Sequence, residues 1–427
     1  MKKIIILMVL LICFSSVTVQ AKVYIDITSP GARQIPIAVV DFEGEDIGRQ
    51  VADIIRSDLD YSGFFRQFDK SAFVEKPNQS FDAQNWKPLG VELVVKGTVE
   101  TITTAMGKVL KVNISVFDVF SSTRILTKSF QARESILRLV SHKAANSVYE
   151  SITGLSGVFD TKIAFVADDL SNRYTNKKYI YIMDWDGERV RKVTDGDNIV
   201  MRPHWSPDGL SLAYTFEKSK RWGINLIDLK TLQSEILLIS QAANITGDFA
   251  PDGENLLISS SIKGISNIYR LNTKSKTLSP LSSTYNIETS PSTSSSGSEI
   301  VYVSDQDSTP QIFIMDKEGN NKRRVTFSGS YNTSPNFSYS GEKIVYSAII
   351  GGKFQVMMIN KDGTNMVQLT SEGNNEEPYF SPDGRYVVFT SDRFGNKSVF
   401  ITRNDGTGQK VLSPNKIRAF GPSWSLK

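Results

Sequence analysis

From about residue 160 onward, short apolar runs alternate with polar turns in a pattern that repeats about every 44 residues. The marker of the repeat is a turn in which Pro at the second position, Asp at the third and Gly at the fourth suit a tight reversal of the backbone. The successive steps are 44, 44, 44 and 43 residues, and a further step of 44 reaches Ser425. This regular self-similarity predicts a repeat architecture. The turns are Ser206-Pro207-Asp208-Gly209, Ala250-Pro251-Asp252-Gly253, Ser294-Ser295-Ser296-Gly297, Ser338-Tyr339-Ser340-Gly341 and Ser381-Pro382-Asp383-Gly384.

Each repeat predicts four short strands. A run rich in β-branched and aromatic residues follows the turn, as at residues 300–302, and a second run follows a polar loop, as at residues 311–315. A second turn such as Asp362-Gly363 leads into a last short strand at residues 368–370. Four strands in about 44 residues is the size of one β-propeller blade.

The two ends of the repeat region predict how the ring closes. Residues 161–196 supply the last three strands of a blade without a preceding turn motif, whereas Pro422-Ser423-Trp424-Ser425 is a first strand with no others behind it. Joining these pieces completes a sixth blade and leaves no exposed sheet edge. We therefore predict an all-β, six-bladed propeller over residues 158–427, closed by the C-terminal strand.

Residues 22–157 lack the repeat and predict a separate α/β domain with a mixed sheet. Strands are expected at residues 35–42, 93–99 and 109–117. Ile47, Val51, Ile54, Ile55 and Leu59 fall on one helical face. A second helix is marked by Ile136, Val140, Ala144 and Val148, and Gly154 is expected to end it.

The first 21 residues read as a secretory signal peptide. Lys2 and Lys3 precede an apolar run at residues 4–14 that is too short to span a membrane, and small side chains favour cleavage after Ala21. Cys13 raises the alternative of a lipoprotein site, but bulky Ile12 precedes it where such sites take a small residue. Cleavage after Ala21 would leave no cysteine, 47 basic and 45 acidic residues, so neither disulfides nor a nucleic-acid partner are expected.

Candidate catalytic and metal-binding chemistry is sparse. The chain has two histidines: His142 on a predicted helix and His204 in a repeat strand, where packing is the favoured interpretation. No Gly-x-Ser-x-Gly nucleophile motif occurs, and no hydrolase domain follows the propeller. The pairs Asp168-Asp169 and Asp305-x-Asp307 lack the full oxygen set of a calcium site, so solvated loop acids are the favoured interpretation. We expect no enzyme activity, no metal and no cofactor.

The residues just before each turn motif form the first candidate partner-binding site. They are expected on loops that enter the innermost strand of each blade and converge on one mouth of the ring. Varied side chains around one rim suit recognition of an asymmetric partner, although polar connectors would look the same. The candidates are Met201, Arg202, Thr246, Glu288, Thr289, Asn332, Thr333, Glu376, Glu377 and Phe420.

A second candidate site is the segment at the predicted mature N-terminus. Its alternating, terminal character allows it either to pair with a partner strand or to fold back on its own domain, and the residues leave both alternatives open. The segment consists of Val23, Tyr24, Ile25, Asp26 and Ile27.

Three features together resemble the TolB family, the periplasmic propeller proteins of the Tol-Pal envelope system. They are the start Lys22-Val23-Tyr24-Ile25-Asp26-Ile27 followed by residues 35–42, the segment at residues 54–65, and the six-blade array with Ser-Pro-Asp-Gly turns. The resemblance covers the whole mature chain. The turns depart from it in places: the third and fourth lack Pro and Asp, and the second lacks Ser.

The resemblance implies a monomeric periplasmic adaptor, peripheral to membranes through its partners. In this family the propeller binds Pal, the peptidoglycan-associated lipoprotein of the outer membrane, and the N-terminal segment is engaged by TolA of the inner membrane. It further implies roles in outer-membrane integrity, in constriction at cell division and in the import of some bacteriocins. A propeller that binds a glycan or small ligand in its central channel is the alternative.

Overall fold

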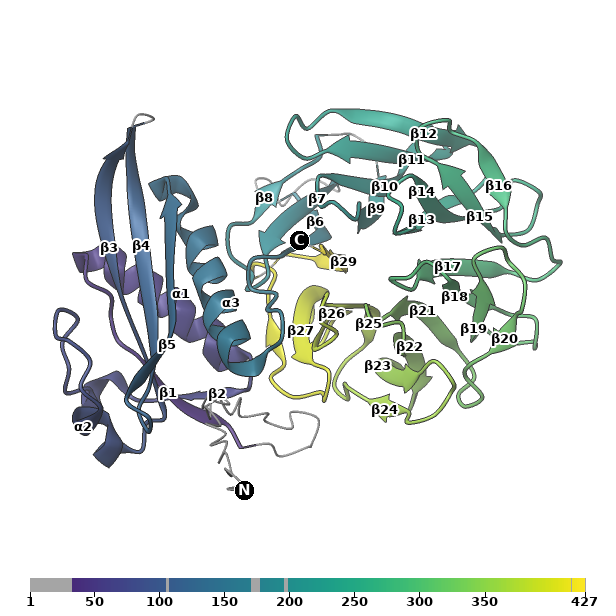
Figure 1. Ribbon diagram of the computed structural model, residues 1–427. Coiled ribbons are helices and arrows are strands. Elements are labelled where there is room, and N and C mark those ends of the chain that lie inside the picture. Colours follow the sequence, from purple (N-terminus) through teal and green to yellow (C-terminus); the bar gives the residue numbers. More distant parts are fainter. Residues whose placement is uncertain (1–32, 105–106, 170–176, 196–198, 416, 427) are drawn as a thin grey trace, which may run out of the picture.

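The computed structural model describes residues 33–104, 107–169, 177–195, 199–415 and 417–426 (Figure 1). The N-terminal domain is built on a five-stranded sheet in the order β2-β1-β3-β4-β5. β1 pairs in parallel with β2 and β3, whereas β3, β4 and β5 are antiparallel, so the predicted mixed sheet is confirmed. The strands are β1 (Ile35–Val39), β2 (Phe65–Gln67), β3 (Leu93–Thr104), β4 (Gly107–Asp118) and β5 (Thr123–Ala132).

Two long helices cover one face of this sheet, and Figure 1 shows α3 between the sheet and the ring. In α1 (Glu45–Tyr61), Val51, Ile55 and Leu59 are buried, which confirms the predicted helical face. α3 (Leu137–Thr153) ends at Gly154, whose left-handed φ of 71° permits the chain to leave the helix. The short α2 (Ala83–Trp86) belongs to a second apolar cluster with other sheet residues.

The propeller consists of six four-stranded antiparallel sheets arranged in a ring (Figure 1). The predicted number of blades is confirmed. The first strand of each blade contacts the first strand of the next, so these strands line the centre of the ring. They are β9 (Ile199–Trp205), β13 (Asn244–Phe249), β17 (Glu288–Thr293), β21 (Asn332–Phe337), β25 (Asn375–Phe380) and β29 (Ala419–Trp424).

The remaining strands complete the blades outward from the centre. The second strands are β6 (Lys162–Asp168), β10 (Ser211–Lys218), β14 (Asn255–Ser260), β18 (Glu299–Ser304), β22 (Lys343–Ile350) and β26 (Tyr386–Ser391). The third are β7 (Lys178–Asp184), β11 (Arg221–Asp228), β15 (Asn267–Asn272), β19 (Gln311–Asp316), β23 (Lys353–Asn360) and β27 (Ser398–Arg403). The fourth are β8 (Arg191–Lys192), β12 (Ser234–Ser240), β16 (Leu278–Pro280), β20 (Arg323–Arg324), β24 (Val367–Gln368) and β28 (Lys410–Val411).

Ring closure occurs where the sequence predicts it. β29 pairs with β6 in antiparallel register, with Trp424 opposite Ile163 and Ala419 opposite Ala167. The backbone N–H of Ser425 then donates to the carbonyl of Lys162 at 2.9 Å. One blade is therefore assembled from both ends of the domain. Of the helices in the described part of the chain, none has the length and apolar character needed to cross a bilayer.

The predicted rim loops are in fact parts of the innermost strands, which corrects the sequence interpretation. Met201 and Arg202 lie within β9, Glu376 and Glu377 within β25, and the other candidates within the remaining inner strands. In each of these strands the pairing with the second strand is interrupted by a shift in register. A proline follows the irregular position in five blades, as Pro291 does in β17. Proline argues against a central strand, but a bulge tolerates it.

Candidate functional site

The inner strands define two mouths of the central channel. Each strand begins at one mouth, which we call the rim face, and ends at the mouth formed by the repeated turns, which we call the turn face. On the rim face the channel narrows to a cavity of about 40 Å³. The lining there includes Arg202, Thr246, Glu377 and Gly421. Three of the predicted partner-binding residues, Arg202, Thr246 and Glu377, therefore line one mouth.

The ten predicted rim residues divide by exposure into two groups. Seven are partly exposed: Met201, Arg202, Thr289, Thr333, Glu376, Glu377 and Phe420. Thr246, Glu288 and Asn332 are buried, with exposed fractions of 1%, 0% and 1%. The hydroxyl of Thr246 donates to the carbonyl of Arg202 at 2.6 Å, and the Asn332 amide donates to Gln311 Oε1 at 2.7 Å. These buried residues form hydrogen bonds with neighbouring segments, so only the seven partly exposed residues are accessible to a partner.

Four blades hold a non-glycine residue in a left-handed backbone conformation at equivalent rim positions. The φ values are 50° at Arg202, 54° at Ser290, 51° at Ser334 and 54° at Glu377. The last blade places Gly421 there, with φ of 60°. A left-handed conformation costs an L-residue about 1–2 kcal/mol, so glycine would be favoured if the backbone alone mattered. Strain of this kind clusters at functional sites and supports a role for the side chains.

Charged side chains at this mouth are paired with one another. Arg202 Nη2 of β9 lies 3.8 Å from Glu377 Oε1 of β25, and β29 lies between these two inner strands in the ring. The Thr390 hydroxyl donates to Glu377 Oε2 at 3.3 Å, and Lys397 pairs with Glu376. Partly exposed pairs of this kind contribute little to stability. They remain available to exchange partners when another charged surface approaches.

A hydrogen-bonded layer of side chains forms the floor between the two mouths. Asp248 accepts from the Tyr379 hydroxyl at 3.0 Å and pairs with His204 Nδ1 at 2.8 Å. Ser292 donates to the other oxygen of Asp248, and its hydroxyl oxygen accepts a hydrogen bond from the Asn336 amide at 3.1 Å. These residues occupy one repeat position, two residues before the first residue of each turn motif. His204 is therefore a hydrogen-bonded channel residue rather than simply a packed strand residue.

On the turn face the channel opens into a cavity of about 900 Å³. Its walls combine Phe337 and Tyr339 with hydroxyl groups such as Ser294 and Ser338. Leu139 and Lys143 of α3 also line it, together with residues 156–158 and 160–162 of the connection to the ring. The larger cavity therefore lies between the ring and the N-terminal domain rather than on the rim face.

Exposed aromatic side chains on the rim face were not found by sequence reasoning. Tyr285, Phe327 and Phe394 are 96%, 75% and 74% exposed. Tyr285 and Phe327 lie in loops that enter β17 and β21, and Phe394 lies in the β26–β27 loop, which the strand register places at the same end. Aromatic residues are enriched in protein interfaces. These aromatic residues are visible in the sequence as Ser-Thr-Tyr285 and Thr-Phe327, but they lie outside the repeated turn motif on which the sequence prediction was based.

The acidic pairs considered for calcium have other partners. The backbone N–H of Ile287 donates to Asp305 Oδ1 at 2.8 Å, and Asp307 Oδ2 lies 2.9 Å from Arg324 Nη1. Asp168 Oδ1 is 3.9 Å from Lys178 Nζ. The predicted partner-binding segment Val23 to Ile27 lies outside the described residues.

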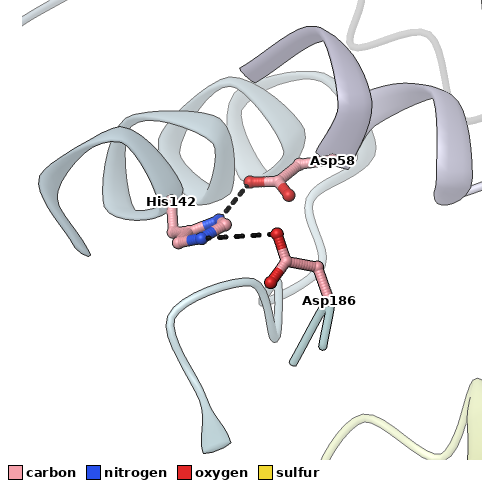
Figure 2. A group of neighbouring side chains, drawn as sticks. All are labelled: Asp58, His142 and Asp186. Atoms are coloured by element: carbon pink, nitrogen blue, oxygen red, sulfur yellow. Dashed lines mark hydrogen bonds and ion pairs between the residues drawn. The ribbon is translucent and has the colours of Figure 1, made fainter. Parts of the chain in front are cut away.

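A separate cluster joins the two domains (Figure 2). His142 of α3 lies between Asp58 of α1 and Asp186 of the β7–β8 turn, so two domains contribute to it. His142 Nδ1 is 2.7 Å from Asp58 Oδ2, and its Nε2 is 3.8 Å from Asp186 Oδ2 without a hydrogen-bond partner. Trp185 Nε1 donates to Asp58 Oδ1 at 3.2 Å. Burial raises the pKa of Asp58 to about 6, although the hydrogen bond from His142 opposes this.

Two carboxylates and an imidazole within 4.8 Å of one another have the composition of a metal site. Two cations already balance them: Arg138 pairs with Asp186, and Lys410 is attracted by both carboxylates. A divalent ion would add two charges to a buried cluster that is already neutralised, which is costly. The residues therefore fit an interdomain contact better than a metal centre.

Comparison with known proteins agrees with both parts of the architecture. A family model described as the TolB amino-terminal domain matches residues 23–125, and one described as the TolB beta propeller domain matches residues 149–427. The crystal structure of TolB from Acinetobacter baumannii has a TM-score of 0.84 at 25% identity, covering 92% of this chain and 97% of its own. A chain of the nidogen/laminin complex shares the fold alone, with a TM-score of 0.51 at 11% identity over 62% of this chain and 98% of its own.

The fold and its two-mouthed channel define a two-domain β-propeller protein. The propeller model alone spans more than half of the sequence. The chain belongs to the TolB family.

Proposed function

We propose that this chain is a non-catalytic periplasmic adaptor of the Tol-Pal system, exported by the signal peptide at residues 1–21. The rim face binds a Pal-type lipoprotein, and the segment Val23 to Ile27 binds a TolA-type inner-membrane protein. Through these contacts the protein supports outer-membrane integrity and constriction during division, and it offers bacteriocins a route of import. The observation that carries this proposal is the match of TolB family models to both domains.

The rim face supports the first half of this proposal in two ways. It keeps side chains such as Arg202 and Glu377 at left-handed positions where glycine would be less strained. It also exposes aromatic side chains at Phe327 and Phe394 on the surrounding loops. Aromatic anchors with a polar surround are the usual composition of a protein-binding hot spot.

Binding of the purified lipoprotein, measured by titration calorimetry, tests this surface. The double variant Phe327→Ser and Phe394→Ser is expected to bind at least about ten-fold more weakly, because each substitution removes an apolar anchor from the interface. Phe120→Ser is the matched control, since Phe120 is 84% exposed but lies on the N-terminal domain. Equal affinity of the double variant and the control would overturn the assignment of the rim face.

Charge reversal requires care because the charged rim residues are paired. Reversing Arg202 and Glu377 together would exchange the pair rather than break it, so Glu377→Lys alone is the informative variant. It would place two cations within contact distance at the mouth and is expected to weaken binding of the lipoprotein. Deleting residues 23–27 is expected to abolish capture of the TolA-type partner while leaving capture of the lipoprotein unchanged.

The cavity on the turn face favours one alternative, a propeller that binds a glycan or another small ligand. Its volume of about 900 Å³ is within the range of ligand sites, and its walls combine aromatic rings with hydroxyl groups. Thermal-shift measurements with soluble peptidoglycan fragments separate the two functions. Stabilisation by fragments in the absence of any protein partner would support the ligand-binding alternative.

A further inference from the structure

The buried cluster at the domain boundary has no part in the rim or in the channel. Asp58 and His142 come from the two long helices of the N-terminal domain, whereas Asp186 comes from the propeller (Figure 2). Trp185 precedes Asp186 in the same turn of the propeller. Asp58 and His142 each have an exposed fraction of 1%. The propeller therefore supplies one hydrogen-bond donor and one carboxylate to a pair that the N-terminal domain already forms.

The surroundings of this cluster are polar contacts and aromatic rings from both domains. Lys410 Nζ of β28 lies 3.8 Å from the centroid of the Tyr61 ring at the end of α1. The Tyr61 hydroxyl donates to the carbonyl of Gly408 at 2.8 Å, and Arg403 donates to the carbonyl of Tyr61. The Tyr61 ring also packs against Trp185, with centroids 5.7 Å apart.

Charged side chains from both domains also surround the cluster. α3 contributes Arg138, which pairs with Asp186 and lies 3.5 Å from Asp184. β28 contributes Lys410, with Arg403 of β27 behind it. The two cations match Asp58 and Asp186, and His142 Nε2 faces Asp186 without a hydrogen bond. Asp58, whose pKa is raised by burial, is therefore a titratable charge at the boundary between the domains.

We propose that docking of the N-terminal domain onto the propeller is linked to a proton, which the cluster of Asp58, His142 and Asp186 binds when the domains meet and releases when they separate. Separation removes Trp185 and Asp186 from the pair and admits water to the Asp58 carboxylate. Water stabilises the charged carboxylate, so the proton leaves. Docking reverses both changes.

The direction of the pH dependence follows from the pKa of Asp58. That pKa is about 6 in the docked protein against an ordinary 3.8, chiefly because of burial. The docked state therefore binds the proton more tightly, and its advantage is complete below about pH 4 and is lost as the pH rises through 6. These values make docking about ten-fold more favourable at pH 5 than at pH 7.

Hydrogen exchange of the full-length protein at pH 5 and pH 7 tests the proposal, with protection corrected for the intrinsic exchange rate at each pH. We expect about ten-fold greater protection at pH 5 in α3 and in residues 184–189. β18, in the blade on the far side of the ring, is expected to show no such change (Figure 1). Equal protection of the domain boundary at both pH values would overturn the proposal.

Asp58→Asn keeps the shape of the side chain and removes its titration, so the pH dependence at the boundary should disappear. Asp53→Asn is the matched control, because Asp53 lies on the same helix with a side chain that is 55% exposed. A retained ten-fold dependence in Asp58→Asn would overturn the proposal. Protection that rises on addition of Zn²⁺ to the wild-type protein at pH 7 would also overturn it, since the cluster would then be a metal site.

Histidine-selective nitrogen NMR of the wild-type protein provides a test that needs no variant at Asp58. The chain has two histidines, so His204 serves as an internal reference for His142. Ring signals of His142 are expected to change as Asp58 gains its proton, because Nδ1 lies 2.7 Å from Asp58 Oδ2. Signals of His142 that stay constant from pH 5 to pH 7 would contradict the proposal.

Discussion

Trp424→Ala is expected to destabilise the whole ring although it alters a single residue of the last strand. The Trp424 side chain is 1% exposed, and its indole N–H donates to the Thr161 hydroxyl at 2.7 Å. Its ring stacks on Tyr386 with centroids 6.3 Å apart. Truncating a buried Trp to Ala costs about 3–5 kcal/mol, and the lost hydrogen bond adds about 1 kcal/mol. We therefore expect the free energy of unfolding to fall by about 5 kcal/mol.

Urea denaturation followed by circular dichroism measures this loss. Leu426→Ala is the matched control, because Leu426 lies just beyond the same strand and is 39% exposed. Its cost should stay below about 1 kcal/mol, as is usual at partly exposed positions. A loss for Trp424→Ala no larger than that of Leu426→Ala would refute the inference that this strand holds the ring closed.

Three further variants test other parts of the structure by urea denaturation. Asp248→Ala should cost about 1–3 kcal/mol, because it leaves the buried Ser292 hydroxyl and the partly buried Tyr379 hydroxyl without their acceptor. An unchanged stability would contradict the floor of the channel described above. Glu75→Gln should cost about 3–5 kcal/mol, because it leaves the buried Lys96 without an opposite charge. Arg33→Gln, in the exposed Arg33–Glu92 pair, should cost under about 1 kcal/mol, and similar losses in both variants would contradict this reasoning. Ser290→Gly should raise stability by about 1 kcal/mol, because its φ of 54° suits glycine, and a destabilised variant would show that the backbone there is not strained.

Blade number and ring closure could be predicted because their signals are local and repeated. Each tight turn needs its own Pro, Asp or Gly, so similar turn residues recur at the same position in successive blades. The alternation of Val112, Ile114 and Val116 identified β4 for a similar reason, since those side chains are all buried. The pairing of β29 with β6 was predicted by counting the strands of each blade, because no residue pattern in these two segments indicates that they pair.

The inner strands were mistaken for loops because their local chemistry opposes a strand. Pro378 follows Glu377, whose left-handed φ is rare for a residue with a side chain, and this combination is typical of a turn. Pairing with the second strand on either side of the bulge overrides that preference. β2 was missed because three residues at a sheet edge give no measurable period.

The candidate sites were less predictable than the fold. A side chain such as Glu288 looks polar and exposed in sequence, yet it is fully buried against Lys322, because burial depends on neighbours from other strands. The contact between Asp58 and His142 joins residues 84 positions apart on two helices, and Asp186 reaches them from another domain. Their spacing in the sequence therefore does not predict that these residues come into contact in the folded protein.

Closure of the ring by β29 also sets an order of events during folding. Lys162 and Ser425 are 263 residues apart, and bringing such distant segments together costs roughly 5 kcal/mol of chain entropy. Equivalent segments of neighbouring blades are about 44 residues apart, and bringing them together costs roughly 3 kcal/mol, so they are expected to associate first. Until β29 pairs with it, β6 presents an unpaired edge of the kind that promotes aggregation. The period before closure is therefore when the folding chain is most at risk of aggregating with other chains.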